Sequence, residues 1–309
     1  MTRNWIIRIL SFFLPIVGLY LLGDHFAYVL FEEQKEMEVK KEDMEVLITG
    51  SSQLKRAVRS DLLSLSSANT SFAWKQHHHD LMTYEYIWER FSPPLNVVVF
   101  EVSYEHFEVP HFTRKNQGNY FAHFYPIDSV RSKYRFEDRF LYLRSVGVMV
   151  RKYTDMMLKI EEEDQYGPLL YETGSDTIAN DPLYVDPRFF SRRTLNDKAY
   201  KFNSVYFMSS VQRVLDRGQQ VVIVLTPKHK NYLHLMNQEL VQRRDSVLNS
   251  IKRKFPEVAI LDKEMDTINY SNEHFWDKNH LNPHGAELFT RSLDSLILQL
   301  VLEDDMRRK

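Results

Sequence analysis

The sequence predicts an α/β domain in which a parallel sheet carries helices on both faces. Two observations lead to this prediction. Short apolar runs rich in Val, Ile and Leu alternate with longer amphipathic segments, and such alternation is typical of a sheet built from strand–helix units. The composition is that of an ordinary globular protein, with 309 residues of which 43% are hydrophobic and 27% are charged. The chain is therefore long enough to form one large domain or two small ones.

The first strand–helix unit is expected shortly after a charged segment. Glu45–Thr49 is an apolar run that predicts a buried strand. Gln53–Ser60 follows with helical character, and Leu62–Leu65 is expected to be a second, short strand. The turn that joins the first strand to its helix is therefore short.

The central strand is expected at Leu95–Val102, because this run is dominated by β-branched residues. The segment before it, Lys75–Phe91, predicts a helix that the following Pro-Pro pair terminates. From Ser103 to about Asn196 the alternation degrades into aromatic residues and turn residues, with a helical stretch near Phe140–Glu163. We expect this region to be a large, partly helical insertion that caps the carboxyl edge of the sheet.

The alternation returns in the last third of the chain. Lys198–Arg217 predicts a helix and Gln219–Thr226 an apolar strand. Tyr232–Phe255 predicts one long helix, Val258–Leu261 a strand and Ala286–Leu302 the final helix. The carboxyl ends of these parallel strands are expected to meet at one edge of the sheet.

The N-terminal segment predicts a membrane anchor. Trp5–Leu22 is apolar apart from Arg8 and Ser11, and has about the length that spans hydrocarbon. Basic residues precede or enter it and acidic residues follow, which places the N-terminus in the cytoplasm and the rest outside, in the periplasm or at the cell surface. A cleaved signal peptide and a buried N-terminal helix are the alternative interpretations. The expected organisation is an anchor at 1–31, a charged stalk at 32–43, and the α/β domain at 44–309 with its insertion at about 103–196.

The composition excludes several classes of protein. There is no cysteine, which excludes disulfides, thiolate catalysis and cysteine-bound zinc. With 9 glycines and no Gly-rich phosphate-binding motif, a nucleotide cofactor is not expected, and the sequence points to no other cofactor. The formal net charge of −2 provides no basic field for nucleic acid.

A candidate nucleophile follows the first predicted strand. Gly50-Ser51-Ser52 lies at its carboxyl end, where ligands bind in α/β sheets, and a helix begins immediately afterwards. Backbone N–H groups at a helix start can stabilise an oxyanion, and Gly50 permits a tight turn. Ser52 is therefore the candidate nucleophile, and Gly50 and Ser51 are candidate pocket residues. The alternative is that one of the serines only caps the helix.

A candidate base and acid occur near the C-terminus. Asp277 precedes His280 by three residues, and Pro283 is well placed as the first residue of the last helix. A histidine base needs an acceptor on its second nitrogen, which an acid three residues earlier supplies. The alternatives are a capped surface turn with a loop histidine, and a metal site formed by Asp277, His280 and His284.

These motifs resemble those of the SGNH/GDSL hydrolases. The first family block, a strand ending in Gly-Asp-Ser, corresponds to Gly50-Ser51-Ser52, and the last block, Asp-x-x-His, corresponds to Asp277 and His280. Ser51 stands where the first block has its aspartate. In this replacement the chain resembles the membrane-anchored branch of the family that contains the D-alanine transfer protein of teichoic acid systems. The resemblance implies a flavodoxin-like three-layer sheet, with Ser52 as nucleophile, His280 as base and Asp277 as orienting acid.

The resemblance also indicates where the oxyanion donors are expected. The family places a glycine after the second strand and an asparagine after the central strand, and this chain has neither in those places. The candidates that remain are the N–H group of Ser52 and the polar groups of Asn69 and Ser103.

Further polar clusters have weaker functional interpretations. His77-His78-His79-Asp80 suggests a metal, but adjacent helical side chains point in different directions, so no metal site is expected there. His229 follows another strand and is a candidate pocket residue or a solvated loop residue. Two basic pairs could attract an anionic glycan or lie on the solvated surface: Arg192 with Arg193, and Lys228 with Lys230.

The sequence thus favours a membrane-anchored, extracytoplasmic serine esterase or O-acyltransferase that works through an acyl-enzyme. The expected partners are the membrane, an envelope glycan as substrate and a membrane acyltransferase. One alternative is a catalytically degenerate relative that binds polysaccharide or a membrane partner. A second alternative is a metal-dependent hydrolase.

Overall fold

The computed structural model describes residues 11–15, 17–19, 21–22, 43–71, 75–109 and 194–308. The sheet and the candidate site belong to the compact unit formed by Val39–Thr113 and Tyr166–Lys309. The predicted helix at Phe140–Glu163, the pair Arg192 and Arg193, and nearly all of the predicted stalk and insertion lie outside the described residues.

The described part of the N-terminal segment is helical. Residues 11–15, 17–19 and 21–22 are in helix, and large apolar side chains such as Phe12 and Leu19 are 65% and 73% exposed. Within the ranges that the structure describes, no helix is both long and apolar enough to cross a membrane.

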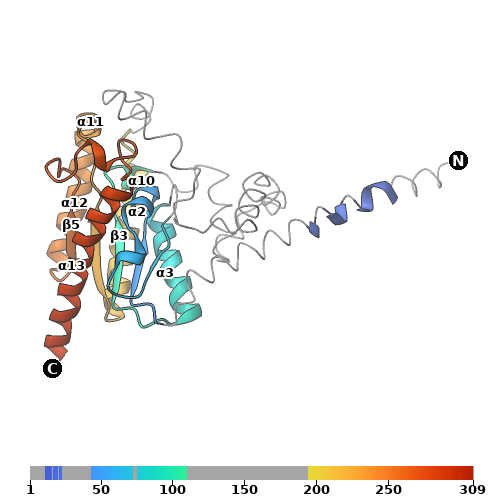
Figure 1. Cartoon of the computed structure of the whole chain (residues 1–309), viewed down its shortest axis with the longest axis horizontal. Helices are drawn as coiled ribbons and strands as arrows, with labels where there is room; N and C mark the ends of the chain where they lie inside the picture. The colour runs from blue at the N-terminus through green and yellow to red at the C-terminus, as the bar shows by residue number, and fades with distance from the viewer. Residues whose placement is uncertain are drawn as a thin grey trace. The chain divides into compact units, whose positions relative to one another are not determined.

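A parallel sheet of five strands forms the centre of the compact unit (Figure 1), and its strand order is β2-β1-β3-β4-β5. This is the flavodoxin-like order 2-1-3-4-5. β1 and β3 are buried along their whole length, as expected for strands covered on both faces. The prediction of a parallel α/β sheet is confirmed. The strands are β1 Val46–Thr49, β2 Ser67–Asn69, β3 Val97–Glu101, β4 Gln220–Leu225 and β5 Ala259–Asp262.

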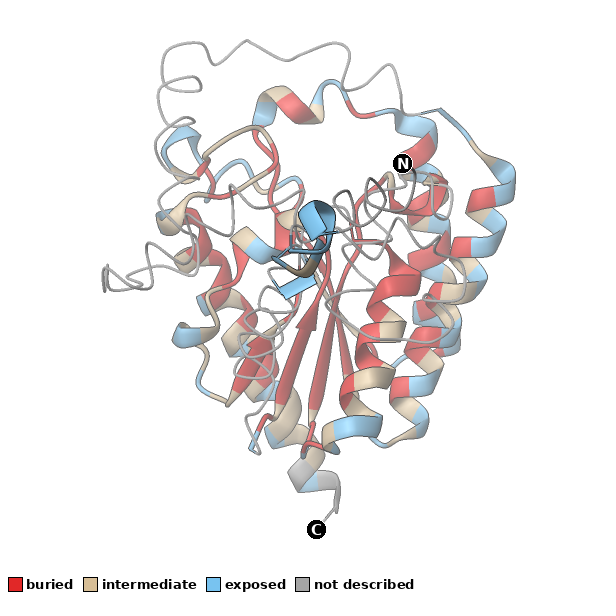
Figure 2. Cartoon of the chain, turned by 90° about the vertical axis from the view of Figure 1, so that its right-hand side faces the viewer, coloured by how far each residue is buried: buried red, intermediate tan, exposed pale blue. Residues whose placement is uncertain are grey.

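Helices cover both faces of the sheet and turn their buried sides toward the strands (Figure 2). Alternate residues of β3 enter the two cores: Val98 and Phe100 lie in one, Val97 and Val99 in the other. The first core is covered by α3 (His77–Phe91), α10 (Asp197–Asp216) and α12 (Gln238–Lys254), and the second by α2 (Ser52–Ala57) and α13 (Pro283–Arg308).

The prediction of a strand at Leu62–Leu65 is wrong. Leu62 ends the 3-10 helix η1 (Ser60–Leu62), and the edge strand β2 begins only at Ser67, opposite Val46. Two of the leucines that suggested a strand, Leu63 and Leu65, instead pack against the core between the sheet and α13. The real strand is short and carries small or polar residues, so apolar periodicity does not reveal it.

The single helix predicted at Tyr232–Phe255 is two helices, α11 (Lys230–Leu233) and α12. Asn237 separates them by capping α12, because its side-chain oxygen accepts the N–H of Glu239 at 3.0 Å. The helix predicted at Gln53–Ser60 is also shorter than expected, since Val58 is already extended.

Candidate active site

The nucleophile turn, which we define as Thr49–Gln53, joins β1 to α2. Ser51 caps the helix, accepting the N–H of Gln53 at 3.2 Å, and Ser52 is the first helical residue. The capping alternative therefore applies to Ser51 and leaves the hydroxyl of Ser52 available. Gly50 is required by close packing, because a Cβ atom there would lie 2.7 Å from Oε2 of Glu101.

Ser52, His280 and Asp277 come together although Ser52 and His280 are 228 residues apart in the chain. The Oγ of Ser52 lies 2.9 Å from Nε2 of His280. The Nδ1 of the same ring lies 2.7 Å from Oδ2 and 2.9 Å from Oδ1 of Asp277. An ionised carboxylate can only accept, so Nδ1 carries the proton of the neutral ring and Nε2 is free to accept the hydroxyl proton of Ser52.

A tight loop at residues 276–280, which we call the acid–base loop, holds Asp277 and His280 together. The N–H groups of Asn279 and His280 donate to Oδ1 of Asp277 at 3.0 and 2.9 Å. The N–H of Trp276 donates to the carbonyl of His280 at 3.0 Å, which closes the loop. Helix α13 begins at Pro283, as the sequence predicts, and the loop is therefore fixed at both ends.

The carboxylate of Asp277 is held in its ionised form. Burial acts to raise its pKa, but the charge and hydrogen bond of His280, the N–H of Asn279 and the charge of Arg56 together bring the pKa below its ordinary value. The guanidinium of Arg56 also stacks 4.5 Å from the ring centre of Trp276. Arg56 thus connects α2, which carries Ser52, to the loop that carries the acid.

The three candidate oxyanion donors are in different environments. The N–H of Ser52 is in the first turn of α2 and has no acceptor within that helix. The amide of Asn69 donates to the carbonyl of Val58 at 3.2 Å and accepts the N–H of Ser71 at 3.1 Å. Ser103 is buried, and its Oγ has no hydrogen-bond partner among the described residues. The amide of Asn69 is thus engaged on both sides, and the N–H of Ser52 and the hydroxyl of Ser103 are the two candidates that remain.

The structure describes all of the histidines that suggested a metal. His77, His78 and His79 lie in the first turn of α3, where the rings of His78 and His79 pack 3.7 Å apart. His284 is exposed on α13. Across the described ranges, no group of three or more His, Asp or Glu side chains is arranged to hold a metal ion.

His229 lines a cavity of about 440 Å³ beside the acid–base loop. Its Nδ1 accepts the N–H of Asn231, so Nε2–H donates to Oδ1 of Asn272 at 2.8 Å. Its own N–H donates to the carbonyl of Lys278 at 2.9 Å. Burial lowers the pKa of the ring, which keeps it neutral. The other lining residues are Lys230, Thr267, Tyr270, Ser271, Asn272 and Glu273.

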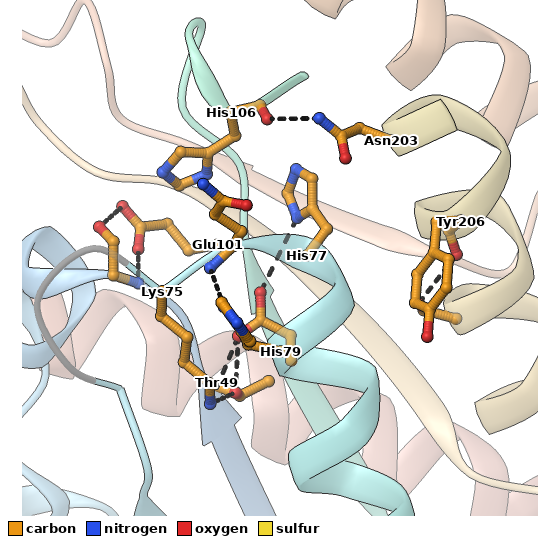
Figure 3. A network of polar contacts seen from close by, with 12 residues as sticks. Thr49, Lys75, His77, His79, Glu101, His106, Asn203 and Tyr206 are labelled. Atoms are coloured by element: carbon orange, nitrogen blue, oxygen red, sulfur yellow. Dashed lines mark hydrogen bonds and ion pairs between the residues drawn. The ribbon is translucent and has the colours of Figure 1, made fainter. Parts of the chain in front are cut away.

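A buried polar network also surrounds the nucleophile turn, and sequence patterns gave little sign of it (Figure 3). Lys75, Asp80, Glu101 and Lys228 are each 2% exposed or less. The available signal was a glutamate in the otherwise apolar strand Val97–Glu101. Of the residues that line the cavity, His229 is a candidate pocket residue in the sequence analysis and Lys230 belongs to a basic pair. The other five have no periodic pattern and were not predicted: Thr267, Tyr270, Ser271, Asn272 and Glu273.

Comparisons with known proteins identify only remote similarities. No family model matches the sequence, and no curated protein is significantly similar to it. A protein provisionally described as a platelet activating factor from Streptococcus pneumonia has 9% identity and a TM-score of 0.44, with 96% of this chain and 100% of that chain covered. A GDSL-like lipase from Bacteroides thetaiotaomicron has 8% identity and a TM-score of 0.44, with 89% and 98% covered.

Proposed function

We propose that the protein is a serine esterase or O-acyltransferase of the SGNH/GDSL type. One observation carries this proposal: Ser52 Oγ lies 2.9 Å from His280 Nε2, while His280 Nδ1 lies 2.7 Å from Asp277. A nucleophile in contact with a base that is in turn oriented by a carboxylate is the arrangement that acyl transfer requires.

The proposed reaction forms and consumes an acyl-enzyme. Oγ of Ser52 attacks the ester carbonyl as its proton passes to Nε2 of His280, and Asp277 stabilises the imidazolium. His280 then gives the proton to the leaving alcohol, and the carbonyl carbon stays bound to Ser52. Water or an acceptor hydroxyl attacks this acyl group next, with His280 taking its proton. The bond between the acyl carbon and Oγ of Ser52 then breaks, His280 returns the proton to Oγ, and the acid or the new ester leaves. The N–H of Ser52 faces the developing oxyanion at the start of α2.

We further propose that the enzyme is membrane-anchored and acts outside the cytoplasm on an ester of an envelope glycan. The apolar N-terminal stretch and its flanking charges support the location. The cavity beside the acid–base loop supports the substrate class, because an amide, a carboxylate and hydroxyls line it, although the triad residues themselves do not. Such groups bond the hydroxyls of sugars. A membrane acyltransferase is the proposed partner that supplies the acyl group.

The competing proposal is a catalytically degenerate protein that binds polysaccharide or a membrane partner. It is favoured by the oxyanion region, because Leu62–Thr70 contains no glycine and the amide of Asn69 is already bonded to Val58 and Ser71. Loss of one oxyanion donor typically lowers kcat about 100- to 1000-fold. This alternative predicts no turnover at all.

Ser52→Ala distinguishes the two proposals. The wild-type chain should hydrolyse p-nitrophenyl acetate and react with a fluorophosphonate, and the variant should lose both activities because Oγ is the nucleophile. Ser64→Ala is the matched control, since the Ser64 hydroxyl is exposed and bonds Asp294. Turnover and labelling that persist in Ser52→Ala would exclude Ser52 as nucleophile, and a wild type without either would favour the binding protein.

A further inference from the structure

Three of the residues in the nucleophile turn are bonded to buried charged side chains. Thr49, Ser51 and Gln53 are each 6% exposed or less. Their partners come from α3, from the end of β3 and from the segment after β4. Burying charge is unfavourable unless hydrogen bonds and opposite charges compensate for it, so the arrangement of these groups is informative.

Glu101, the last residue of β3, holds Ser51. Its Oε2 accepts the backbone N–H of Ser51 at 2.5 Å, and its Oε1 accepts the hydroxyl at 3.1 Å. The contact is close enough to exclude any side chain at Gly50. One bond from this carboxylate fixes the backbone N–H of Ser51, and the other fixes the rotamer of its side chain.

Lys228 holds Gln53 from the other side. Its Nζ donates to the side-chain oxygen of Gln53 and, at 2.7 Å, to Oγ1 of Thr226. The backbone N–H of Gln53 donates to Oγ of Ser51 at 3.2 Å, and Oγ of Ser51 donates to Glu101. Glu101, Ser51, Gln53 and Lys228 therefore form one continuous chain of hydrogen bonds.

Thr49 is held in the same manner at the end of β1. Its hydroxyl donates to Oδ1 of Asp80 at 2.8 Å and accepts from Nζ of Lys75. The Nζ of Lys75 and Oδ1 of Asp80 are themselves 3.4 Å apart and buried, and Lys75 lies beside Thr49 in the network of Figure 3. Residues 49, 51 and 53 are thus fixed, and the hydroxyl of Ser52 between them faces His280.

We propose that Glu101 and Lys228 are positioning residues that clamp the two neighbours of the nucleophile. This inference rests on the proposed function of Ser52. The clamp holds the Ser52 hydroxyl at the base and, because the N–H of Ser51 is occupied by Glu101, leaves the N–H of Ser52 for the oxyanion. Burial raises the pKa of Glu101, and the positive charge of Lys228 and the two Ser51 bonds act against this rise and favour the ionised carboxylate.

The test measures kcat and KM for p-nitrophenyl acetate and the rate of fluorophosphonate labelling, using the full-length chain. Glu101→Gln, Lys228→Met and Ser51→Ala should lower kcat about 10- to 100-fold, the effect of small misplacement of a reacting group. KM should change by less than about twofold, because these side chains do not touch the substrate. Ser51→Thr should restore most of the rate, since its hydroxyl can both donate to Glu101 and accept from Gln53.

Glu264→Gln is the matched control. Glu264 is equally buried, and its carboxylate bonds Arg244 and not the nucleophile turn. Its contact with Lys228 is made by the backbone carbonyl, which the substitution keeps. It should lower the melting temperature while kcat stays at the wild-type value. A role of Ser51 in capping alone predicts the same pattern for Ser51→Ala, a lower melting temperature with unchanged kcat.

The outcomes separate the clamp from the proposed function. If the wild type is active, Ser52→Ala is inactive and the three clamp variants keep wild-type kcat, the clamp is overturned and the function stands. If the wild type neither turns over ester nor labels, the function fails and the positioning role fails with it. A loss of kcat in Glu264→Gln as large as in Glu101→Gln would also overturn the clamp, since any buried charge would then suffice.

Discussion

The acid and the base are held to each other by hydrogen bonds within a few residues, although Arg56 and His229 also contact their loop, whereas the nucleophile turn is held by hydrogen bonds that span the chain. Asp277 bonds N–H groups two and three residues ahead of it. Ser51, in contrast, bonds a carboxylate 50 residues away, and Gln53 bonds a lysine 175 residues away. The acid–base loop can therefore form as a local unit, but the nucleophile turn acquires its geometry only when the sheet is assembled.

The largest effect is expected from a substitution in the acid–base loop, where the contacts are local. Asp277→Asn should lower kcat roughly 1000- to 10,000-fold, because an amide does not hold His280 in the tautomer that accepts the serine proton. Circular dichroism and the melting temperature should remain close to those of the wild type, since the loop keeps its backbone contacts. Steady-state kinetics with p-nitrophenyl acetate checks this, with exposed Asp61→Asn as control. A reduction below about tenfold would mean that His280 is oriented by another group.

The next largest effect is expected from a substitution in the nucleophile turn, where the contacts are long-range. Thr49→Val keeps the shape of the side chain but removes the hydroxyl that Asp80 and Lys75 share. The free energy of unfolding should fall by about 1–3 kcal/mol, the cost of leaving buried polar partners with one bond fewer. Denaturant titration measures it. Val is sterically similar to Thr, so a change smaller than about 0.5 kcal/mol would show that the network adds little to stability.

The smallest effect is expected on the stability that the Asp277 carboxylate in the acid–base loop contributes at acid pH. Burial acts to raise the pKa of Asp277, but His280, the N–H of Asn279 and the charge of Arg56 together hold it below its ordinary value of 3.8. The stabilisation is thus fully present above pH 3.8 and is lost as the pH falls through the lower, folded-state pKa. It is small because the side chain is 44% exposed. Between about pH 6 and about pH 2, the melting temperature should fall less steeply with decreasing pH for Asp277→Asn than for the wild type. An equal dependence on pH in the two proteins would contradict the linkage.

The same contrast explains how much the sequence could predict. The apolar runs of β1, β3 and β4 and the spacing of Asp277 and His280 are local signals, and both led to elements that the structure contains. The edge strand Ser67–Asn69 was missed, because its small polar residues are strand-forming only beside β1. The Asn237 cap that divides α11 from α12 was overlooked within an apolar helical pattern.

The partners of the nucleophile turn could not be predicted, because no spacing rule connects Ser51 to Glu101 or Gln53 to Lys228. Glu101 in an apolar strand was the one visible irregularity. A charged residue inside a predicted buried strand indicates that a partner exists, but it does not say which residue the partner is. That information is in the parallel register, which places Glu101 one residue beyond the pairing of Thr49 with Phe100.

Helix α13 has a practical consequence for work on this chain. It begins at Pro283, three residues after His280, and runs 26 residues toward the C-terminus (Figure 1). At 1.5 Å per residue, its far end is about 39 Å from the catalytic loop. A fluorophore or an affinity tag attached after α13 is therefore about one helix length away from His280, and it does not touch the contacts that orient this side chain.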